Sequence, residues 1–552
     1  MNKDSNKVRQ YEAVIRNLTE RDISYSLNFV FGSDIDEDDV FRTTLDSAEG
    51  GNAPGLDAGL HRVLARSDGL AGPSGLPTRR WNEWQPPSCL HAANVRDSRR
   101  FSTKEGSTMS TRSLAAAVTA ALLLLTATAH AADKKVVRLW QTETEPQTLA
   151  VLNQIAAQYE KTHPDVSIKI EGLAWGDLEK KLTAALAAGA PPDAAHGQPI
   201  TCVSFAAKGL LRPVEDLADS LGKDNIVDAF RALCRWQGRT YGVGHSPASS
   251  LFVYRKDLLA QKGLKVPKTW DELIQTAEAL KESKDGQVVR YGLTMTGAPL
   301  FINIGIGELL KTNGGRLFDE QGRPTLTSKQ VIELLDFYKK LNGVLPPGWT
   351  GHGYLDTFAN LANGKAAMLY QAYGRGTGYI EKYAPKEIAD PDHFAVADKM
   401  VGPSGKSPAA QLDCEPWMVF KDAKGGAEAV DFLKFFFKDE NYIPYLHSVP
   451  IHLLSIKKST TKSPKYADNA MIAKWRPWVD MQEKYFRNDW IKPVLVTEWD
   501  DMNKPYLLEV MGSGILVDMV FDSVKGMPSA EAAAKAQKRV EELLVQGGYL
   551  KK

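Results

Sequence analysis

Two closely spaced pairs of carboxylates are the first candidates for chemistry in this chain of 552 residues. Glu143 stands two residues before Glu145, and Asp413 stands two residues before Glu415. Glycoside hydrolysis uses two carboxyl groups at a fixed separation, one of them as the general acid. Neither pair lies in a hydrolase motif. We therefore expect no catalytic residues, and a glycan-active enzyme is the alternative.

Metal and cofactor chemistry has little support in the sequence. No Cys-x-x-Cys pair and no HExxH motif occurs, so we expect no metal site and no cofactor. After Cys89, three cysteines remain, namely Cys202, Cys234 and Cys414. Cys202 and Cys234 can form a disulfide in an oxidising compartment, but their separation in sequence does not establish the required geometry. Three buried free thiols are the alternative.

A secretory signal peptide is predicted at residues 109–131, in the interior of the chain. Arg112 supplies a positive charge, residues 114–126 are apolar, and Ala129-His130-Ala131 has the small-residue pattern of a cleavage site. The apolar run is shorter than the roughly 20 residues of a membrane span, and an uncleaved anchor is the alternative. We expect the mature protein to begin near Ala132, in the periplasm.

The first 108 residues differ in character from the remainder. Residues 8–45 resemble a short piece of the barrel of B12-binding radical SAM enzymes, but the CxxxCxxC motif of that family is absent. Residues 46–108 are rich in Gly, Pro, Ser and Arg and show no sustained periodicity, which is typical of disorder. We expect residues 1–108 to be a non-native or disordered extension that does not pack against the mature chain.

The overall composition is that of a soluble globular protein. Hydrophobic residues make up 43% and charged residues 24%, with a formal net charge of +1. Nucleic-acid binding would need a basic face, so we expect no nucleic-acid partner. The mature chain of about 420 residues is long enough for two to three units of roughly 150 residues.

Strands and helices alternate along the mature chain. Strict alternation of apolar residues predicts a strand over 166–170, and helical spacing predicts a helix over 149–159. Further strands are expected at 136–140, 251–254, 291–295, 366–370 and 415–420, and further helices at 177–188, 270–283, 328–342, 427–438 and 530–545. This order predicts an α/β fold with a largely parallel sheet. Ligands of such sheets bind at the carboxyl ends of strands, where Trp140 and Trp175 are expected.

Five segments in order carry a resemblance to a known family. They read AAGAPPD (187–193), GRTYGV (238–243), LFVYRKDLL (251–259), VPKTWDEL (266–273) and FANLANGKAAM (358–368). Their arrangement is similar to that of the extracellular solute-binding proteins of ABC importers, family 1, which includes maltose-binding protein. The resemblance covers nearly the whole mature chain. It departs at Gly244-His245, where the family usually has a proline.

The resemblance implies a two-lobed periplasmic binding protein fold of type II, with a hinge and a cleft between the lobes. Such proteins close around their ligand by hinge motion. We assign residues 132–244 and 372–414 to the first lobe. Residues 245–371 and 415–552, including the C-terminal helices, are assigned to the second lobe.

The implied function is a monomeric periplasmic protein that binds a carbohydrate or polyol and delivers it to the permease subunits of an ABC importer. Aromatic rings stack on sugar rings, while carboxylates and amides bind hydroxyl groups. Expected ligand-binding residues lie at strand ends or lobe crossings: Trp140, Glu143, Trp175, His245, Ser246, Tyr373, Arg375, Glu415 and Trp417, with His452 as a further candidate. Glu415 and Trp417 face the cleft only if the neighbouring strand begins after them.

Two alternatives share the same implied fold. A phosphorylated polyol or another anionic solute would use Arg375 as its partner, because guanidinium groups bind phosphate in a bidentate manner. A sensory module that reports to a membrane receptor would bind its solute in the same cleft. The sequence does not distinguish among the sugars and polyols.

Overall fold

The computed structural model describes residues 134–551, apart from residues 223, 228, 229, 231, 232, 488–493 and 496–503. The predicted extension and signal peptide lie outside the described residues. A five-stranded sheet organises the first lobe, in the order β2-β1-β3-β14-β6. Its strands are β1 (Lys135–Gln141), β2 (Val166–Gly172), β3 (Ala194–Ala195), β6 (Gly242–Gly244) and β14 (Pro416–Val419). β1 runs parallel to β2 and β3, whereas β14 is antiparallel to β3 and β6.

Amphipathic helices cover this sheet. Helix α5 (Pro146–Thr162) begins at a proline and buries Leu152, Ile155 and Tyr159, which recur at helical spacing. It packs against β2, α16 (Gly426–Phe436) and α17 (Asp439–Ser448). The other helices of this lobe are α6 (Trp175–Ala187), α7 (Pro199–Ala207) and α8 (Glu215–Ser220). The predicted helices at 149–159, 177–188 and 427–438 are confirmed.

A three-stranded antiparallel sheet organises the second lobe, in the order β11-β8-β12. Its strands are β8 (Leu251–Arg255), β11 (Met368–Ala372) and β12 (Phe394–Ala397). Leu251 and Val253 contribute to one hydrophobic core, while Phe252 between them contributes to the other. Because side chains alternate across a strand, this sheet is buried on both faces.

The second core is enclosed mainly by helices. Trp270 begins α11 (Trp270–Leu280), is 3% exposed, and stacks on Phe337 with ring centroids 4.3 Å apart, so it is a packing residue. The helix starts with a capping box formed by Thr269 and Glu272. The other helices around this core are α10 (Lys256–Gln261), α12 (Pro299–Thr312), α13 (Lys329–Val344), α22 (Leu507–Gly512), α23 (Ile515–Val524) and α24 (Ser529–Gln546).

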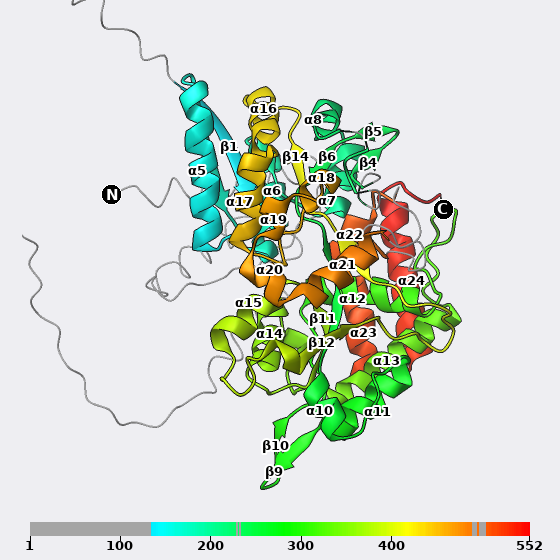
Figure 1. Cartoon of the computed structure of the whole chain (residues 1–552). Coiled ribbons are helices and arrows are strands. Elements are labelled where there is room, and N and C mark those ends of the chain that lie inside the picture. The colour runs from blue at the N-terminus through cyan, green and yellow to red at the C-terminus, as the bar shows by residue number, and fades with distance from the viewer. Residues whose placement is uncertain are drawn as a thin grey trace, which may run out of the picture. The chain divides into compact units, whose positions relative to one another are not determined.

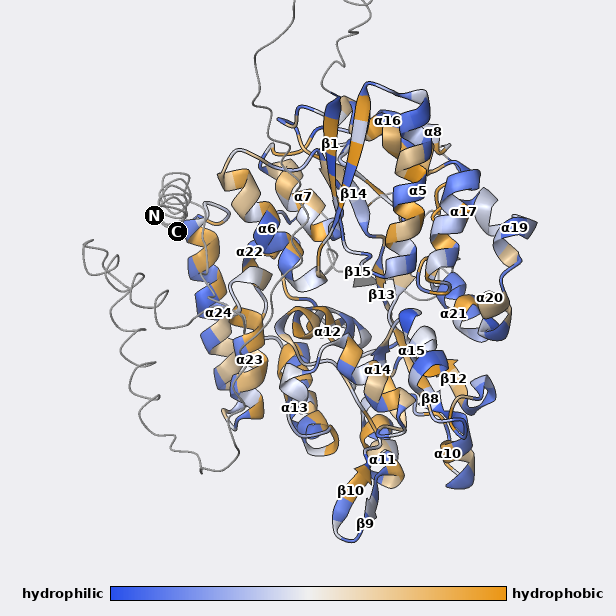
Figure 2. Cartoon of the chain, turned by 90° about the vertical axis from the view of Figure 1, so that its left-hand side faces the viewer, coloured by the Kyte–Doolittle hydropathy of each residue, from blue (hydrophilic) through white to orange (hydrophobic). Residues whose placement is uncertain are grey.

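Helix α24 shows how the C-terminal helices are held. Hydrophobic and hydrophilic residues mix along its surface in Figure 2, and its buried residues include Ala533, Ala536, Val540 and Leu544. It packs against α23 and α13. Figure 1 shows α24 and α23 beside α13, well away from α5 and α16. The C-terminal helices therefore pack with the second core.

A small third sheet, in the order β15-β13-β7, connects the two lobes. The chain leaves β6 of the first sheet, forms β7 (Ala248–Ser249), and enters β8 of the second. It returns through β13 (Gln411–Asp413), which pairs antiparallel with β7 and leads into β14. The third strand is β15 (Val494–Leu495). These short strands are the crossings at which the lobes meet.

The predicted lobe boundaries need correction after residue 372. β12 lies in the second sheet, although residues 372–414 were assigned to the first lobe. β14 lies in the first sheet, although residues from 415 were assigned to the second lobe. The physical reason is that the chain crosses back at β13, and a run of four buried residues does not reveal which sheet it joins. α16 and α17 follow β14 into the first lobe.

The predicted strand at 291–295 is also not formed as a strand. Tyr291 and Thr294 make isolated parallel bridges to Ala366 and Leu369. A Cβ on Gly292 would lie 1.9 Å from the carbonyl oxygen of Ala277, so this segment is pressed against α11. The segment therefore makes two single bridges instead of the regular hydrogen-bond pairing of a strand.

The remaining elements surround the three sheets or pack against them. They are β4 (Arg235–Trp236), β5 (Arg239–Thr240), β9 (Glu282–Lys284), β10 (Gln287–Arg290), η1 (Trp349–Gly351), α14 (Tyr354–Ala362), α15 (Arg375–Tyr383), η2 (Pro391–His393), α18 (Lys458–Thr461), α19 (Pro464–Ala467), α20 (Ala470–Lys474) and α21 (Arg476–Arg487). Among the described helices, none has the length and apolar character needed to span a membrane.

Candidate functional site: a cavity at the lobe crossings

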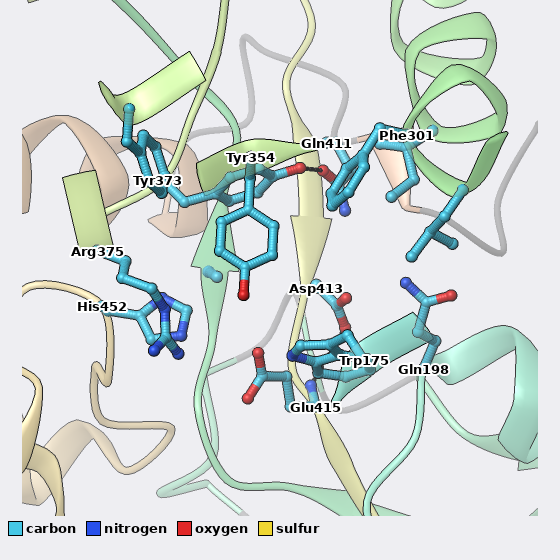
Figure 3. Close-up of a pocket in the computed structure, with 14 residues that line it drawn as sticks. Trp175, Gln198, Phe301, Tyr354, Tyr373, Arg375, Gln411, Asp413, Glu415 and His452 are labelled. Atoms are coloured by element: carbon cyan, nitrogen blue, oxygen red, sulfur yellow. Dashed lines mark hydrogen bonds between the residues drawn. The ribbon is translucent and has the colours of Figure 1, made fainter. Parts of the chain in front are cut away.

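A cavity of about 80 Å³ lies where the crossing strands meet helices of both lobes. Figure 3 shows the side chains that line it converging from separate elements. First-lobe helices α6 and α7 begin at its edge, and second-lobe helices α12 and α14 supply the opposite wall. Its lining residues are Trp175, Gln198, Ala248, Leu300, Phe301, Ile304, Tyr354, Phe358, Tyr373, Arg375, Gln411, Asp413, Glu415 and His452.

Aromatic rings form much of the cavity wall. Phe301 and Phe358 both meet Tyr354 edge to face, with ring centroids 5.7 Å and 5.8 Å apart. The ring of Tyr354 projects into the middle of the site in Figure 3, with its hydroxyl directed toward Glu415 and Trp175. The hydroxyl of Tyr373 donates a hydrogen bond of 2.6 Å to Oε1 of Gln411. The wall therefore combines flat apolar faces with hydroxyl and amide groups.

A buried ion-pair cluster closes one side of the cavity. Nη2 of Arg375 lies 2.8 Å from Oε2 of Glu143, and the same guanidinium also pairs with Glu145. Nε2 of His452 lies 3.7 Å from Oε1 of Glu143. Burial alone would raise the pKa of Glu143, but the charge of Arg375 and the contact with His452 hold that pKa well below its ordinary value.

Two further carboxyl groups line the cavity on the crossing between β13 and β14. Burial raises the pKa of Asp413 to about 6. Burial also raises the pKa of Glu415 well above its ordinary value, and the charges of Glu143 and Asp413 act in the same direction. Glu415 has a φ of 43°, a conformation that residues other than glycine seldom adopt. Such strained positions cluster at functional sites.

The structure brings together five of the ten residues named as ligand candidates. The candidates that line the cavity are Trp175, Tyr373, Arg375, Glu415 and His452. Glu143 lies directly behind Arg375 and is fully buried. Like Glu143, the other four candidates are not among the lining residues; they are Trp140, His245, Ser246 and Trp417.

Trp417 lies inside strand β14 and is 2% exposed. Its predicted cleft position required the strand to begin after it, whereas the strand begins at Pro416. Its ring meets His196 edge to face, with centroids 4.0 Å apart. Trp140 is half-buried within β1 and packs against the first core. Both tryptophans are packing residues rather than lining residues.

His245 and Ser246 lie just behind the cavity wall and are fully buried. His245 stacks on His196, with ring centroids 4.0 Å apart. Oγ of Ser246 donates to the carbonyl oxygen of His452 over 3.4 Å. The glycine before His245 has a packing reason, since a Cβ on Gly244 would lie 2.7 Å from Cβ of Cys414.

Several lining residues were not identified as ligand candidates from the sequence. They are Gln198, Ala248, Leu300, Phe301, Ile304, Tyr354, Phe358, Gln411 and Asp413. Most of the apolar ones lie on helices α12 and α14, where their spacing resembles that of core residues. Asp413 could have been identified as a ligand candidate from the sequence, because it stands two residues before Glu415 on the same crossing.

The predicted disulfide is not formed. Cys202, Cys234 and Cys414 are all buried free thiols. A Cβ on Gly242 would meet both Sγ of Cys202 at 2.9 Å and Cβ of Cys234 at 3.3 Å, so these two cysteines are neighbours across β6. Burial raises the pKa of the Cys234 thiol well above its ordinary value, which keeps it protonated.

Comparisons with known proteins agree with this architecture. The family described as bacterial extracellular solute-binding protein matches residues 143–443. A mannitol-binding protein of Pseudomonas aeruginosa is 30% identical over 262 residues, which are 46% of this chain and 59% of that protein. A putative periplasmic-binding protein of an ABC transporter from Escherichia coli is 21% identical over 412 residues, covering 73% of this chain and 91% of that protein.

Two solved structures have a similar fold. A solute-binding protein of an ABC transporter from Agrobacterium radiobacter, in complex with ribitol, has a TM-score of 0.62 at 21% identity and covers 74% of this chain and 99% of its own. A maltose-bound protein of T. maritima has a TM-score of 0.61 at 20% identity and covers 74% of this chain and 100% of its own. These likenesses concern the two-lobed fold.

Proposed function

The chain belongs to the family of bacterial extracellular solute-binding proteins, and from this premise we propose that it is the solute-binding component of an ABC importer. The solute is a carbohydrate or a polyol, bound in the cavity at the lobe crossings and delivered to the permease subunits. Relatives and structural neighbours that bind mannitol, ribitol and maltose support this proposal. The observation that carries it is the combination of aromatic rings and hydroxyl-binding groups around one cavity.

The lining residues suit a solute that carries many hydroxyl groups. Trp175, Tyr354 and Tyr373 offer ring faces on which C–H groups pack. Gln198 and Glu415 offer oxygen atoms that accept hydrogen bonds from hydroxyls, and the amide of Gln198 also donates. Pockets of this type bury the apolar part of a ligand and use a few placed polar groups for orientation.

We favour a neutral solute over a phosphorylated one. Arg375 is the one lysine or arginine among the residues that line the cavity, and it already pairs with Glu143 and Glu145. Two carboxylates therefore balance its charge before any solute arrives. Asp413 and Glu415 add two further acidic groups to the wall. A phosphate would have to displace a buried ion pair and approach these acids, which costs free energy.

We further propose that the protein is exported, that its signal peptide is cleaved near Ala131 and Ala132, and that it acts as a monomer without catalytic turnover. The periplasmic relative from E. coli supports export. N-terminal sequencing of the exported form tests the cleavage. A mature chain that starts at Met1 would contradict it. Turnover of a labelled oligosaccharide would contradict the non-catalytic role.

Calorimetric titration tests the solute class. Mannitol, ribitol and maltose are titrated beside phosphorylated polyols of matched length. We expect at least one neutral solute to bind, and its phosphate ester to bind more weakly by tenfold or more, where tenfold corresponds to about 1.4 kcal/mol. Tighter binding of the phosphate would reverse the assignment. Binding of neither class would place the solute outside the polyols and sugars.

A further inference from the structure

A second polar cluster lies behind Glu415, on the side of this residue that the solute proposal does not use. His196, His245 and Glu415 each present one nitrogen or carboxylate oxygen, and these three atoms lie within 4.8 Å of one another. The side chains come from three separate parts of the first lobe and are 1%, 0% and 5% exposed. Nε2 of His196, Nε2 of His245 and Oε2 of Glu415 have no hydrogen-bond partner within the described protein.

Unpartnered polar atoms at this depth are costly. A buried donor or acceptor left without a partner loses its hydration and gains no hydrogen bond in return, which destabilises the fold. Three of them within 4.8 Å of one another are therefore an arrangement that an additional group would stabilise. Buried polar groups that lack hydrogen-bond partners call for a specific explanation, such as a bound water molecule or a bound ion.

The hydrogen bonding of His245 fixes which of its nitrogens faces the cluster as an acceptor. Its Nδ1 contacts the backbone carbonyl oxygen of Glu415. A carbonyl only accepts, so Nδ1 carries the proton and Nε2 presents a lone pair. Nε2 of His245 lies 3.6 Å from Oε2 of Glu415. Because an ionised carboxylate oxygen is also an acceptor, these two atoms do not hydrogen-bond to each other when Glu415 is ionised. A backbone carbonyl on Nδ1 is the usual means of orienting a histidine that binds a metal through Nε2.

We propose that His196, His245 and Glu415 form a binding site for a divalent transition-metal ion such as Zn²⁺. Two imidazoles and one carboxylate are donors that zinc takes in tetrahedral sites, with a fourth position left for water or another ligand. Calcium and magnesium are disfavoured because they take oxygen ligands. Since Glu415 also lines the solute cavity, the ion lies at the cavity wall, with this carboxylate between the ion and the solute.

The neighbouring group of Glu143, Glu415 and His452 is the competing site. Its donor atoms also lie within 4.8 Å of one another. However, Arg375 already neutralises Glu143 at 2.8 Å. A second cation there would be repelled by the guanidinium, and that group offers one imidazole where the first group offers two. The charge distribution thus favours the site with two histidines.

Binding requires a local rearrangement of the two rings. They are stacked, with centroids 4.0 Å apart and planes at 25° to each other. The rings must therefore turn before both Nε2 atoms can bind one ion. Nδ1 of His196 accepts from the amide of Thr142 at 3.3 Å, which places the proton of its neutral ring on Nε2. Metal binding moves that proton to Nδ1, which then donates a hydrogen bond to Oγ1 of Thr142, 3.2 Å away, and no longer accepts from the amide of Thr142.

Metal titration of the full chain without added solute tests the site. The protein is treated with a chelator, desalted, and titrated with Co²⁺ by visible absorption and with Zn²⁺ by calorimetry. We expect one tight site per chain, with the d–d absorption bands of four- or five-coordinate Co²⁺. His245→Ala and Glu415→Gln should each weaken it by at least about tenfold, the lower limit seen even for groups outside the ligand set.

Two histidine variants give the experiment its controls. His163→Ala removes a histidine at the end of α5, with 38% of its side chain exposed, and should leave the tight site intact. His452→Ala distinguishes the competing triad. If it weakens binding as much as His245→Ala does, the ion lies on the Glu143 side and the proposal is overturned. Equal binding by the parent, His245→Ala and Glu415→Gln would mean adventitious surface binding and would also overturn it.

A measurement on the unmodified chain covers the case in which His245→Ala fails to fold. X-ray absorption of the zinc-loaded protein should show nitrogen and oxygen ligands at about 2.0–2.2 Å. A sulfur shell at about 2.3 Å would instead assign the ion to the cysteines and refute the site. All of these measurements are made without solute, so their failure leaves the transport proposal untouched.

Discussion

Two of the buried ion pairs among the described residues differ in how completely they are enclosed. Lys399 and Glu308 lie in the second lobe and are 2% and 0% exposed, with Nζ 3.1 Å from Oε1. Arg375 and Glu143 lie at the cavity, with 13% and 0% of their side chains exposed. Both pairs bury charge, yet only the second faces a space that a solute can enter.

The partners of Lys399 indicate a structural role. Its Nζ donates to Oγ of Ser250 at 2.8 Å and to the carbonyl oxygen of Leu251 at 3.2 Å, and it also contacts the carbonyl oxygen of Tyr370. Oε2 of Glu308 accepts from the backbone amide of Gln411 at 2.9 Å. This pair therefore ties helix α12 to β13 and to the β8–β11 pairing, where the chain crosses between the lobes.

The cluster around Arg375 instead leaves several buried polar atoms without a hydrogen bond. Oε1 of Glu143, Oε2 of Glu145 and both ring nitrogens of His452 have no hydrogen-bond partner within the described protein. Buried polar groups are ordinarily hydrogen-bonded. Oε1 of Glu308 also lacks a hydrogen bond, so neither buried charge nor a free polar atom identifies a site by itself; the adjacent cavity is what distinguishes the Arg375 pair.

The largest expected effect follows from breaking the enclosed pair. Lys399→Met leaves Glu308 buried without a cation and should lower the free energy of unfolding by about 3–5 kcal/mol. Urea unfolding measures this change. Lys340→Met is the matched control, because Lys340 pairs with Asp271 at 2.7 Å but is 54% exposed, and exposed pairs contribute at most about 1 kcal/mol. Equal losses in both variants would show that the enclosed pair has no special role.

Trp417→Ala should have a comparable effect on stability. The indole is 2% exposed in the first core, and truncation of a buried aromatic residue costs about 3–5 kcal/mol. Solute affinity of the folded fraction should change little. Urea unfolding and titration on the same preparation separate the two quantities. A loss of solute affinity with unchanged stability would instead indicate that Trp417 contacts the solute.

Trp175→Ala and Tyr373→Ala should show the opposite balance. Both side chains are half-buried and line the cavity, so their loss removes a surface on which the solute packs. We expect affinity to fall by about 1–3 kcal/mol, roughly ten- to a hundredfold. Calorimetric titration measures the affinity, and thermal unfolding provides the check on stability. Parent-like binding by both variants would place the solute elsewhere.

Much of the fold follows from local patterns, but the site depends on long-range placement. Helical spacing locates α5, and Thr269 with Glu272 marks the start of α11. The resemblance to the solute-binding family also predicted a lobe crossing near residue 415. It does not show that β14 joins the first sheet antiparallel, and this placement decides that Glu415 lines the cavity while Trp417 enters the core.

The residues missed at the site have a common physical explanation. Phe301 and Tyr354 lie on helices α12 and α14, whose apolar residues mostly face a core. A ring that lines a cavity and a ring that fills a core follow the same helical periodicity. Likewise, His196, His245 and Glu415 are far apart in sequence and meet only after three segments have been packed together.

The smallest expected effect concerns an exposed pair. Nε of Arg239 lies 2.7 Å from Oε1 of Glu215, with 58% and 39% of their side chains exposed. The bond from Arg239 lowers the pKa of Glu215 from 4.5 to about 2 in the folded protein. Because the folded pKa lies below the unfolded one, the stabilisation is present above pH 4.5 and is lost as the pH falls toward 2.

Arg239→Gln measures this contribution against the buried pairs. The stability difference from the parent should be a small fraction of that for Lys399→Met at pH 7, should shrink as the pH falls from about 4.5 to about 2, and should shrink with added salt, since salt screens exposed charges. Urea unfolding at several pH values and two salt concentrations provides the data. The loss in Lys399→Met should persist at high salt, because buried pairs are screened much less. If salt reduced both differences equally, enclosure would not be what separates the two kinds of ion pair.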